Sequence, residues 1–255
     1  MNIQFIRHAT LWLEYAGLTC LIDPMFSDAG VNPPIVNTAN PRRNPLVPLP
    51  FPLAEIGQPD VIIVTHLHGD HWDGAAAETV PKTTPILCQP GDEGSFTAAG
   101  FTSVTAIQES LTLQGVTLYR TGGQHGTGEI GKLMGQVSGF VFKADNEPTL
   151  YLAGDTIWCE DVQQALERHL PDWTVVNAGG AQFEVEDPIT MDGNDVVSLC
   201  RYAPFTKIVA VHMDAINHCH VTRADLRDRL VLEELLEQVV IPEDGAWVTR
   251  SATRE

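Results

Sequence analysis

The chain has 255 residues, 44% of them hydrophobic, which is enough to bury one substantial core, so we expect a single domain spanning residues 1–255. Its 33 Asp and Glu residues outnumber 15 Lys and Arg residues, and the formal net charge of −18 argues against a nucleic-acid partner. The sequence shows neither a signal-peptide pattern nor an apolar run of the roughly 20 residues that cross a bilayer, so we predict a cytoplasmic protein without a membrane partner.

Three short strands are the first predicted elements, at residues 2–7, 11–16 and 18–23, where apolar and polar residues alternate. Residues 27–59 are then the most proline-rich part of the chain, which excludes helix interiors and central strands. A loop of this length is typical of a lid, of a binding-site wall or of a plain surface excursion, and the sequence leaves these alternatives open.

After this loop, strands and helices alternate. Four consecutive β-branched residues predict a buried strand at 60–64, which is followed by a helix at about 72–78 and a strand at 84–89. Further strands are predicted at residues 103–107, 111–120, 136–143, 148–153, 172–176 and 207–211, and further helices at 158–168, 191–201 and 222–238. This order favours an α+β protein in which two mixed β-sheets face each other with helices outside, a four-layer αββα sandwich.

The stretch THLHGDHWDG, residues 65–74, places three histidines and two aspartates directly after the strand at 60–64. The carboxyl end of a buried strand is where α/β folds place their sites. His66 and His68 point to the same side of an extended segment and can bind one ion, whereas Asp70 and His71 follow where the chain can turn back to a second ion. Imidazole with carboxylate suits zinc, and also manganese or iron, so this stretch predicts a metal site.

Two ions need further ligands, and three candidates also lie just past strand ends. His125 follows VTLYRT across two glycines, which allow a close approach of the backbone. Asp155 ends TLYLAGD at a sharp glycine turn, and its carboxylate can bridge two cations. His212 ends KIVAVH, another buried strand, while His218 is the alternative late ligand.

The order of these motifs resembles the metallo-β-lactamase superfamily of dinuclear metallohydrolases. H-x-H-x-D-H after a strand, a lone His, a G-D-T element and a late His carry the resemblance, together with IRHATLWLEYAGLTCLIDP at the amino terminus. Within the superfamily the chain looks most like the ascorbate-6-phosphate lactonase-like branch. The resemblance implies a metallo-β-lactamase-like fold, a first metal held by His66, His68 and His125, a second held by Asp70, His71 and His212, and a bridge formed by Asp155.

Such a site predicts hydrolysis. Two divalent ions roughly 3.5 to 4 Å apart can share a hydroxide that attacks an acyl carbon or a phosphorus, and the chain has no G-x-S-x-G nucleophile motif. Asp70 is the candidate for handing a proton to the leaving group, although metal ligation alone would equally explain its place. We therefore expect two divalent ions per chain, zinc or manganese before iron, as cofactors.

A small molecule is the predicted substrate, with a lactone or a related ester favoured. The alternatives are a metal-dependent phosphodiesterase, against which the acidic composition counts, and a non-catalytic metal-binding regulatory protein. Superfamily members that reduce oxygen at two irons typically carry Glu at the place of His68, so the resemblance favours hydrolysis over redox chemistry. The sequence leaves a homo-oligomer open.

Weaker predictions concern residues around the metal site. Candidates for substrate contact are His8, Asn177 and His218, each close to a predicted strand end. Asp73, just after the motif, is expected to hydrogen-bond a metal-bound histidine. Arg42 and Arg43 offer a partner for an anionic substrate, with plain surface charge as the favoured alternative, and His169 is expected on a surface helix outside the site.

Overall fold

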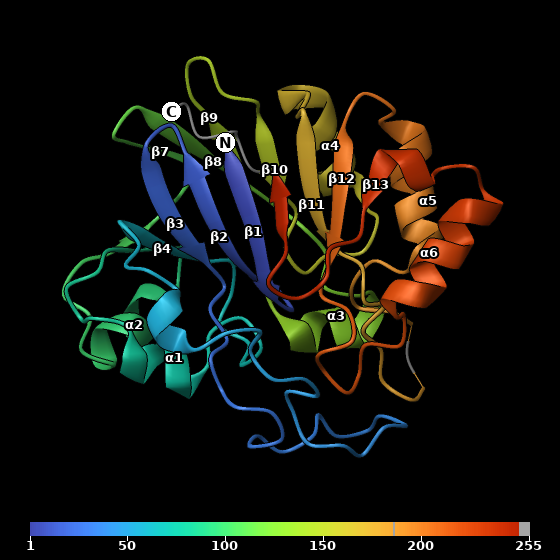
Figure 1. Ribbon diagram of the computed structural model, residues 1–255, viewed down its shortest axis with the longest axis horizontal. Helices are drawn as coiled ribbons and strands as arrows, with labels where there is room; N and C mark the ends of the chain where they lie inside the picture. Colours follow the sequence, from blue (N-terminus) through green and yellow to red (C-terminus); the bar gives the residue numbers. More distant parts are fainter. Residues whose placement is uncertain (186, 250–255) are drawn as a thin grey trace.

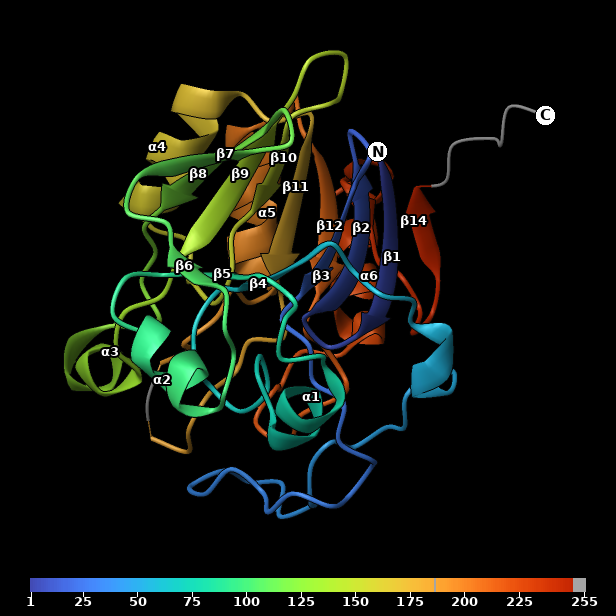
Figure 2. The ribbon, with the colours of Figure 1, turned by 90° about the vertical axis from the view of Figure 1, so that its left-hand side faces the viewer.

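Two seven-stranded sheets face each other in the computed structural model, which describes residues 1–185 and 187–249 (Figures 1 and 2). The first sheet has the order β14 (Trp247–Thr249), β1 (Asn2–Arg7), β2 (Thr10–Tyr15), β3 (Leu18–Ile22), β4 (Val61–Val64), β5 (Ile86–Cys88) and β6 (Val104–Ala106). The second has the order β13 (Val239–Val240), β12 (Lys207–Val211), β11 (Trp173–Asn177), β10 (Leu150–Leu152), β9 (Gly139–Lys143), β8 (Val116–Thr121) and β7 (Ser110–Leu113).

Both sheets are mixed in the same way. In the first sheet the pairs from β14 to β3 are antiparallel and those from β3 to β6 are parallel. In the second sheet the pairs from β7 to β10 are antiparallel and those from β10 to β13 are parallel. Because parallel neighbours end at the same edge of a sheet and the two sheets face each other, the loop after β4 in the first sheet and the loops after β10 and β12 in the second can supply side chains to one site.

Burial on both faces explains why the sequence of strand β4 does not alternate between apolar and polar residues. Val61 and Ile63 belong to the core between the sheets, whereas Ile62 and Val64 pack toward the outer helices. All four side chains are fully buried. A strand covered on both faces is apolar throughout, as this one is.

Helices cover the outer face of each sheet, so the predicted four-layer sandwich is confirmed (Figure 1). The first sheet packs against α1 (Gly74–Thr79) and α2 (Glu93–Ala98), and the second packs against α4 (Glu160–His169), α5 (Gly193–Tyr202) and α6 (Arg223–Leu232). A further helix, α3 (Gly128–Met134), lies with α1 and α2 below the strands in Figure 2, where the first part of the loop 27–59 also runs.

Several predicted elements are corrected by the structure. The expected strand 111–120 is a hairpin of β7 and β8, because Gln114 and Gly115 have φ angles of 48° and 83° and form a turn with left-handed backbone. The helix expected over 222–238 ends at Leu232, followed by a short 3-10 helix at Leu236–Gln238. The sequence pattern did not predict α2, α3, β13 or β14, which are short elements.

His169 lies on α4, a helix on the outer face of the second sheet, as predicted. It ends α4, but only 8% of it is exposed, and its ring lies 5.2 Å from the ring of Tyr119 in β8. The helix therefore turns this residue toward the second sheet. The buried position of this side chain on an outer helix shows that amphipathicity near a helix end depends on what packs over it.

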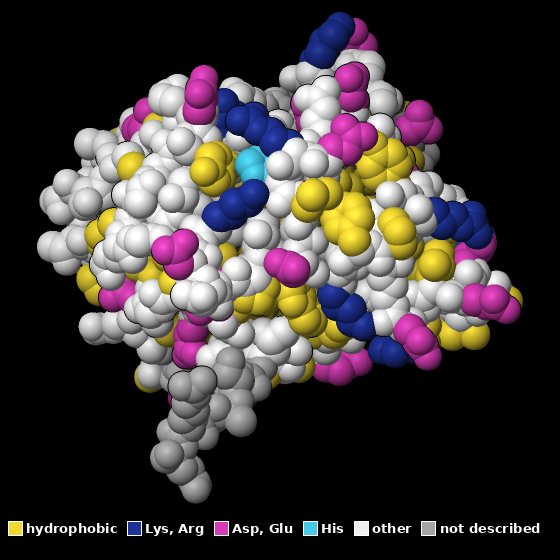
Figure 3. All heavy atoms as spheres, turned by 90° about the horizontal axis from the view of Figure 1, so that it is seen from above, with side chains coloured by type: hydrophobic (Ala, Val, Ile, Leu, Met, Phe, Trp, Pro, Cys, Tyr) yellow, Lys and Arg dark blue, Asp and Glu magenta, His cyan; other side chains and the backbone are white. Residues whose placement is uncertain are grey.

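The surface of the described chain mixes charges of both signs. On the face in Figure 3, Lys and Arg side chains are interspersed with Asp and Glu and with apolar side chains. Among the described residues, no helix combines the length and apolarity needed to span a bilayer.

Candidate metal centre

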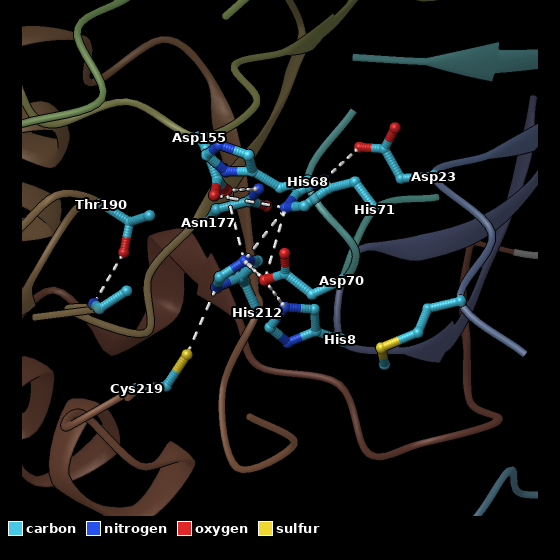
Figure 4. Close-up of polar contacts among 12 residues, drawn as sticks. His8, Asp23, His68, Asp70, His71, Asp155, Asn177, Thr190, His212 and Cys219 are labelled. Atoms are coloured by element: carbon cyan, nitrogen blue, oxygen red, sulfur yellow. Dashed lines mark hydrogen bonds and ion pairs between the residues drawn. The ribbon is translucent and has the colours of Figure 1, made fainter. Parts of the chain in front are cut away.

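The seven residues predicted as metal ligands converge on one cluster at the ends of the strands. Figure 4 labels His68, Asp70, His71, Asp155 and His212 among them. Four of them come from the loop between β4 and α1, and the other three follow β8, β10 and β12. The seven are His66, His68, Asp70, His71, His125, Asp155 and His212. The residues that the sequence analysis predicted just past strand ends therefore lie close together in the structure.

One group of donors consists of His66, His68 and His125, whose ligand atoms all lie within 4.8 Å of one another. The Nε2 atom of His125 is 3.3 Å from Nδ1 of His68. Gly122 and Gly123 permit this position of His125, since a Cβ atom at either glycine would lie 3.0 Å from a neighbouring side chain.

A second group consists of His8, Asp70, His71 and His212, whose ligand atoms also lie within 4.8 Å of one another. The Nε2 atoms of His71 and His212 are 3.3 Å apart, and Oδ2 of Asp70 is 3.5 Å from Nε2 of His212. The late histidine of the cluster is thus His212, while His218 is outside every group of potential ligands among the described residues.

Asp155 lies between the two groups. Its Oδ2 atom is 3.5 Å from His125 and 3.3 Å from His71, and its Oδ1 atom is 3.3 Å from His212. The turn that presents it needs Gly154, because the backbone there has a φ of 71° and a Cβ atom would lie 2.7 Å from the carbonyl oxygen of Ser138. Burial raises the pKa of the Asp155 carboxyl, but His212 and His71 outweigh burial and hold the pKa well below its usual range.

The donor set fits divalent metal ions. Imidazole nitrogens approach one another closely around the buried carboxylate of Asp155 and the partly buried one of Asp70, and the buried Nε2 of His66 has no hydrogen-bond partner among the described residues. A buried nitrogen without a partner costs free energy, and a cation bound by its lone pair removes that cost. Nitrogen and carboxylate oxygen ligands suit zinc, manganese and iron.

Asp23 orients one ligand, a role that the sequence analysis had given to Asp73. Its Oδ2 accepts hydrogen bonds from Nδ1 of His71 and from Oγ1 of Thr65, both at 2.8 Å. With its proton on Nδ1, His71 presents the Nε2 lone pair to the cluster. Asp73 instead caps α1 by accepting from Ala76 N at 2.7 Å, so that prediction was wrong.

Asn177 and His8 hydrogen-bond to two carboxylates of the cluster and do not line the cavity beside it. The amide of Asn177 donates to Oδ1 of Asp155 at 2.6 Å, and Nε2 of His8 is 3.0 Å from Oδ2 of Asp70. Neither residue is part of the wall of the cavity beside the cluster, so the expectation that they touch substrate is corrected. Both are buried polar residues that hold a carboxylate in place.

The ring of His8 stacks on that of His212, with centroids 3.6 Å apart. Two imidazoles bound to one ion at about 2.1 Å and at a right angle would have centroids about 4.5 Å apart or more. The stacking therefore favours a positioning role for His8 over direct ligation. Both residues have left-handed backbone, and the carbonyl of His8 accepts from the amide of His212 at 2.8 Å, which ties the two sheets together at the site.

A cavity of about 460 Å³ opens beside the cluster, and its volume is typical of small-molecule sites. The cluster contributes His68, Asp70, His125 and Asp155 to the wall. Apolar side chains form most of the rest, namely Met25, Pro33, Ile35, Trp72, Met134, Phe183, Ile189 and Ile216. His218 also lines the cavity, as its predicted contact with substrate requires.

The proline-rich loop 27–59 supplies one side of this cavity, which resolves the alternatives that the sequence left open. Asn217 attaches the loop to the segment after β12. Its side chain accepts from Ile35 N at 3.0 Å and from Asn44 Nδ2 at 2.8 Å, and donates to Asn40 O at 2.6 Å. Sequence reasoning missed Asn217, because its partners lie more than 170 residues away along the chain.

Arg42 and Arg43, in the same loop, are exposed and do not line the cavity. The guanidinium of Arg43 donates to the backbone carbonyls of Gly30 and Val31. Among the described residues, the wall of the cavity contains neither lysine nor arginine. Any bound metal ions are therefore the cations that a ligand would meet there.

Comparisons with known proteins agree with this geometry. The chain matches the family model described as Beta-lactamase superfamily domain over residues 19–213. The UPF0173 protein YddR of Bacillus subtilis (strain 168) is 36% identical over 253 residues, which cover 98% of this chain and 100% of that protein. The solved isothiocyanate hydrolase from Delia radicum gut bacteria is 37% identical with a TM-score of 0.94, over 99% and 100% of the two chains. A possible metal-dependent hydrolase from Veillonella parvula DSM 2008 is 38% identical with a TM-score of 0.95, over 98% and 99%.

Proposed function

This chain belongs to the beta-lactamase superfamily as a metal-dependent hydrolase, and we propose that it acts on small, uncharged, apolar substrates at a centre of two divalent ions. The observation that carries the proposal is the cavity, whose apolar wall opens directly onto the His and Asp cluster. An apolar wall binds apolar groups by removing their surface from water. The reactive part of such a substrate would lie against the cluster.

In this proposal the first ion is held by His66, His68 and His125, the second by Asp70, His71 and His212, and Asp155 contacts both. Divalent ions bound there would lower the pKa of water toward neutrality and polarise the substrate, which removes the need for a serine or cysteine nucleophile. Zinc or manganese is favoured over iron.

Asp70 is the proposed proton carrier of the reaction. Its carboxylate lines the cavity and accepts from His8 at 3.0 Å, so it lies between the cluster and the bound substrate. Burial raises the pKa of Asp70, but His71 and the contacts with His212 and His8 hold the pKa well below its usual range. The group is ionised and can take a proton from water and pass it to a leaving group.

An isothiocyanate is the first substrate candidate. The group R–N=C=S is uncharged and apolar, and its central carbon is the electrophile; water adds there, the C–N bond breaks, and a primary amine and carbonyl sulfide are released. The similarity to the isothiocyanate hydrolase, at 37% identity over almost the whole of both chains, supports this choice. Lactones and related esters are the second candidate, since they too are uncharged and present an electrophilic carbon.

A phosphorylated substrate fits the cavity less well. Its negative charges would lie beside Asp70 and Asp155, and among the described residues the wall offers no guanidinium or ammonium group to pair with them. The phosphodiesterase alternative is therefore disfavoured on the same ground. The narrower resemblance to the ascorbate-6-phosphate lactonase-like branch stays a prediction, as does a cytoplasmic location.

Elemental analysis of the purified protein, paired with a substrate screen, tests the proposal. The screen compares alkyl and arylalkyl isothiocyanates, lactones and phosphodiesters, each with zinc and with manganese. Close to two ions per chain with turnover of an uncharged substrate is the expected result. Two ions with turnover of phosphodiesters alone would overturn the substrate class, and two ions without turnover would favour the non-catalytic alternative. A protein that stays metal-free after reconstitution would overturn the centre itself.

A further inference from the structure

We propose that His218 is the polar anchor of the substrate, the side chain that binds the heteroatom next to the reactive carbon. The proposal rests on the function proposed above, because it assigns a contact within the same cavity. His218 lines the cavity wall and is only 7% exposed, and its Nδ1 has no hydrogen-bond partner among the described residues. A buried polar nitrogen without a partner costs free energy, which a ligand that hydrogen-bonds the ring would recover.

The other polar side chains of the wall either have partners already or are less buried than His218. Those of the metal cluster are His68, Asp70, His125 and Asp155. Asn44 is hydrogen-bonded to Asn217 at 2.8 Å, and Asp73 caps α1. Asn32 is half-buried, and its backbone pairs with that of Asn44. Among the described wall residues, His218 is therefore the nine-tenths buried polar side chain that is free to bind a ligand.

The position of His218 is held from both sides. The preceding residue, Asn217, is bonded to the loop 27–59, and the carbonyl of His218 accepts from Gln182 N at 2.9 Å. Its ring lies beside Phe183, 6.2 Å between centroids. A side chain fixed in this way loses little conformational entropy when it binds a ligand.

Burial lowers the pKa of His218 to about 4, so the ring is neutral at neutral pH. A neutral imidazole offers one N–H donor and one acceptor. The donor suits the nitrogen or sulfur of an isothiocyanate and the ring oxygen of a lactone equally well. The anchor would thus orient an uncharged substrate without adding a charge to the apolar cavity. It would contribute no hydrogen bond to the binding of a hydrocarbon, which has no acceptor.

Three variants test this role: His218→Ala, His218→Gln, which keeps an amide donor, and His220→Ala as a control, since His220 is exposed two residues further on. Metal content, kcat and KM are measured with 2-phenylethyl isothiocyanate. We expect all three to keep the wild-type metal content, and kcat/KM to fall about 3- to 10-fold in His218→Ala, partly recover in His218→Gln and stay unchanged in the control. Loss of metal in His218→Ala would overturn the proposal, because it would make His218 a ligand.

A binding experiment separates the anchor from simple packing and does not need turnover. Calorimetry compares N-(2-phenylethyl)formamide with butylbenzene, a hydrocarbon of similar shape, on the wild type and on His218→Ala. We expect the formamide to bind about 3- to 10-fold more weakly to the variant and butylbenzene to bind equally to both. Equal weakening of both ligands would overturn the proposal. If the wild type turned over no isothiocyanate or lactone but showed this discrimination, the proposed function would fail while the assignment of His218 stood.

Discussion

Replacing Asp23 with Asn should weaken metal binding at the His71 side of the centre by about 10- to 100-fold, or about 1.4 to 2.8 kcal/mol. The carboxylate of Asp23 accepts three hydrogen bonds. Its Oδ1 takes the amide of Thr65 at 2.7 Å, and its Oδ2 takes the hydroxyl of Thr65 and Nδ1 of His71, both at 2.8 Å. This arrangement keeps the proton of His71 on Nδ1 and leaves Nε2 free for a metal.

An asparagine side chain cannot reproduce these three bonds. If its oxygen faces the Thr65 amide, its NH₂ group faces Nδ1 of His71 and favours the tautomer with the proton on Nε2, which cannot bind a metal. If the amide is flipped, its NH₂ group faces the N–H of Thr65, and a buried donor loses its acceptor. Either orientation disturbs the ligand while the volume of the side chain stays the same.

Competition titration of the metal-free protein against a chelator, with zinc and with manganese, measures the change. Asp60→Asn is a control, because the exposed Asp60 also accepts from the amide and hydroxyl of one threonine, Thr19, both at Oδ2, but contacts no histidine among the described residues. Metal affinity of Asp23→Asn within twofold of the wild type would refute the tautomer argument. So would an equal loss in Asp60→Asn, since the effect would then come from general destabilisation.

Three further substitutions test other parts of the structure. Asp155→Ala should abolish binding of both ions and hydrolysis together, since its carboxylate lies within 3.8 Å of four imidazole nitrogens; two ions retained in elemental analysis would reject the bridge. Asn217→Ala should lower Tm by roughly 4 to 8 °C and raise KM with unchanged metal content, because the cavity wall loses its attachment; calorimetry and kinetics check this. Burial lowers the pKa of His169 to about 4, below about 6.5 in the unfolded chain, so the free energy of unfolding should fall as pH drops through this window. Urea unfolding of His169→Gln should show a flatter decrease, and a curve identical to that of the wild type would contradict the assignment.

Local patterns in the sequence predicted much of the fold and most of the cluster. The β-branched run 61–64 predicts a strand because its side chains favour extended backbone, and burial on both faces explains its lack of polar residues. The spacing of His66, His68, Asp70 and His71 predicts a metal site because neighbouring residues along one loop stay close in any fold. His125, Asp155 and His212 could be named because each follows a recognisable strand.

Roles that depend on contacts between distant segments were not predictable in this way. The sequence assigned the histidine-orienting carboxylate to Asp73, a neighbour of the motif, whereas the structure gives it to Asp23, which β3 places beside the end of β4. His8 and Asn177 were expected at the substrate and instead hold Asp70 and Asp155.

The sequence by itself determined which residues can bind metal and that they follow strand ends, because side-chain chemistry and the periodicity of strands are local properties. Only the tertiary structure decided that His212 joins the cluster while His218 faces the cavity, and that the loop 27–59 forms a wall of that cavity. These outcomes depend on how two sheets pack and on hydrogen bonds such as those between Asn217 and residues 35–44. Packing and long-range hydrogen bonds are set by the whole chain at once, so no short segment encodes them.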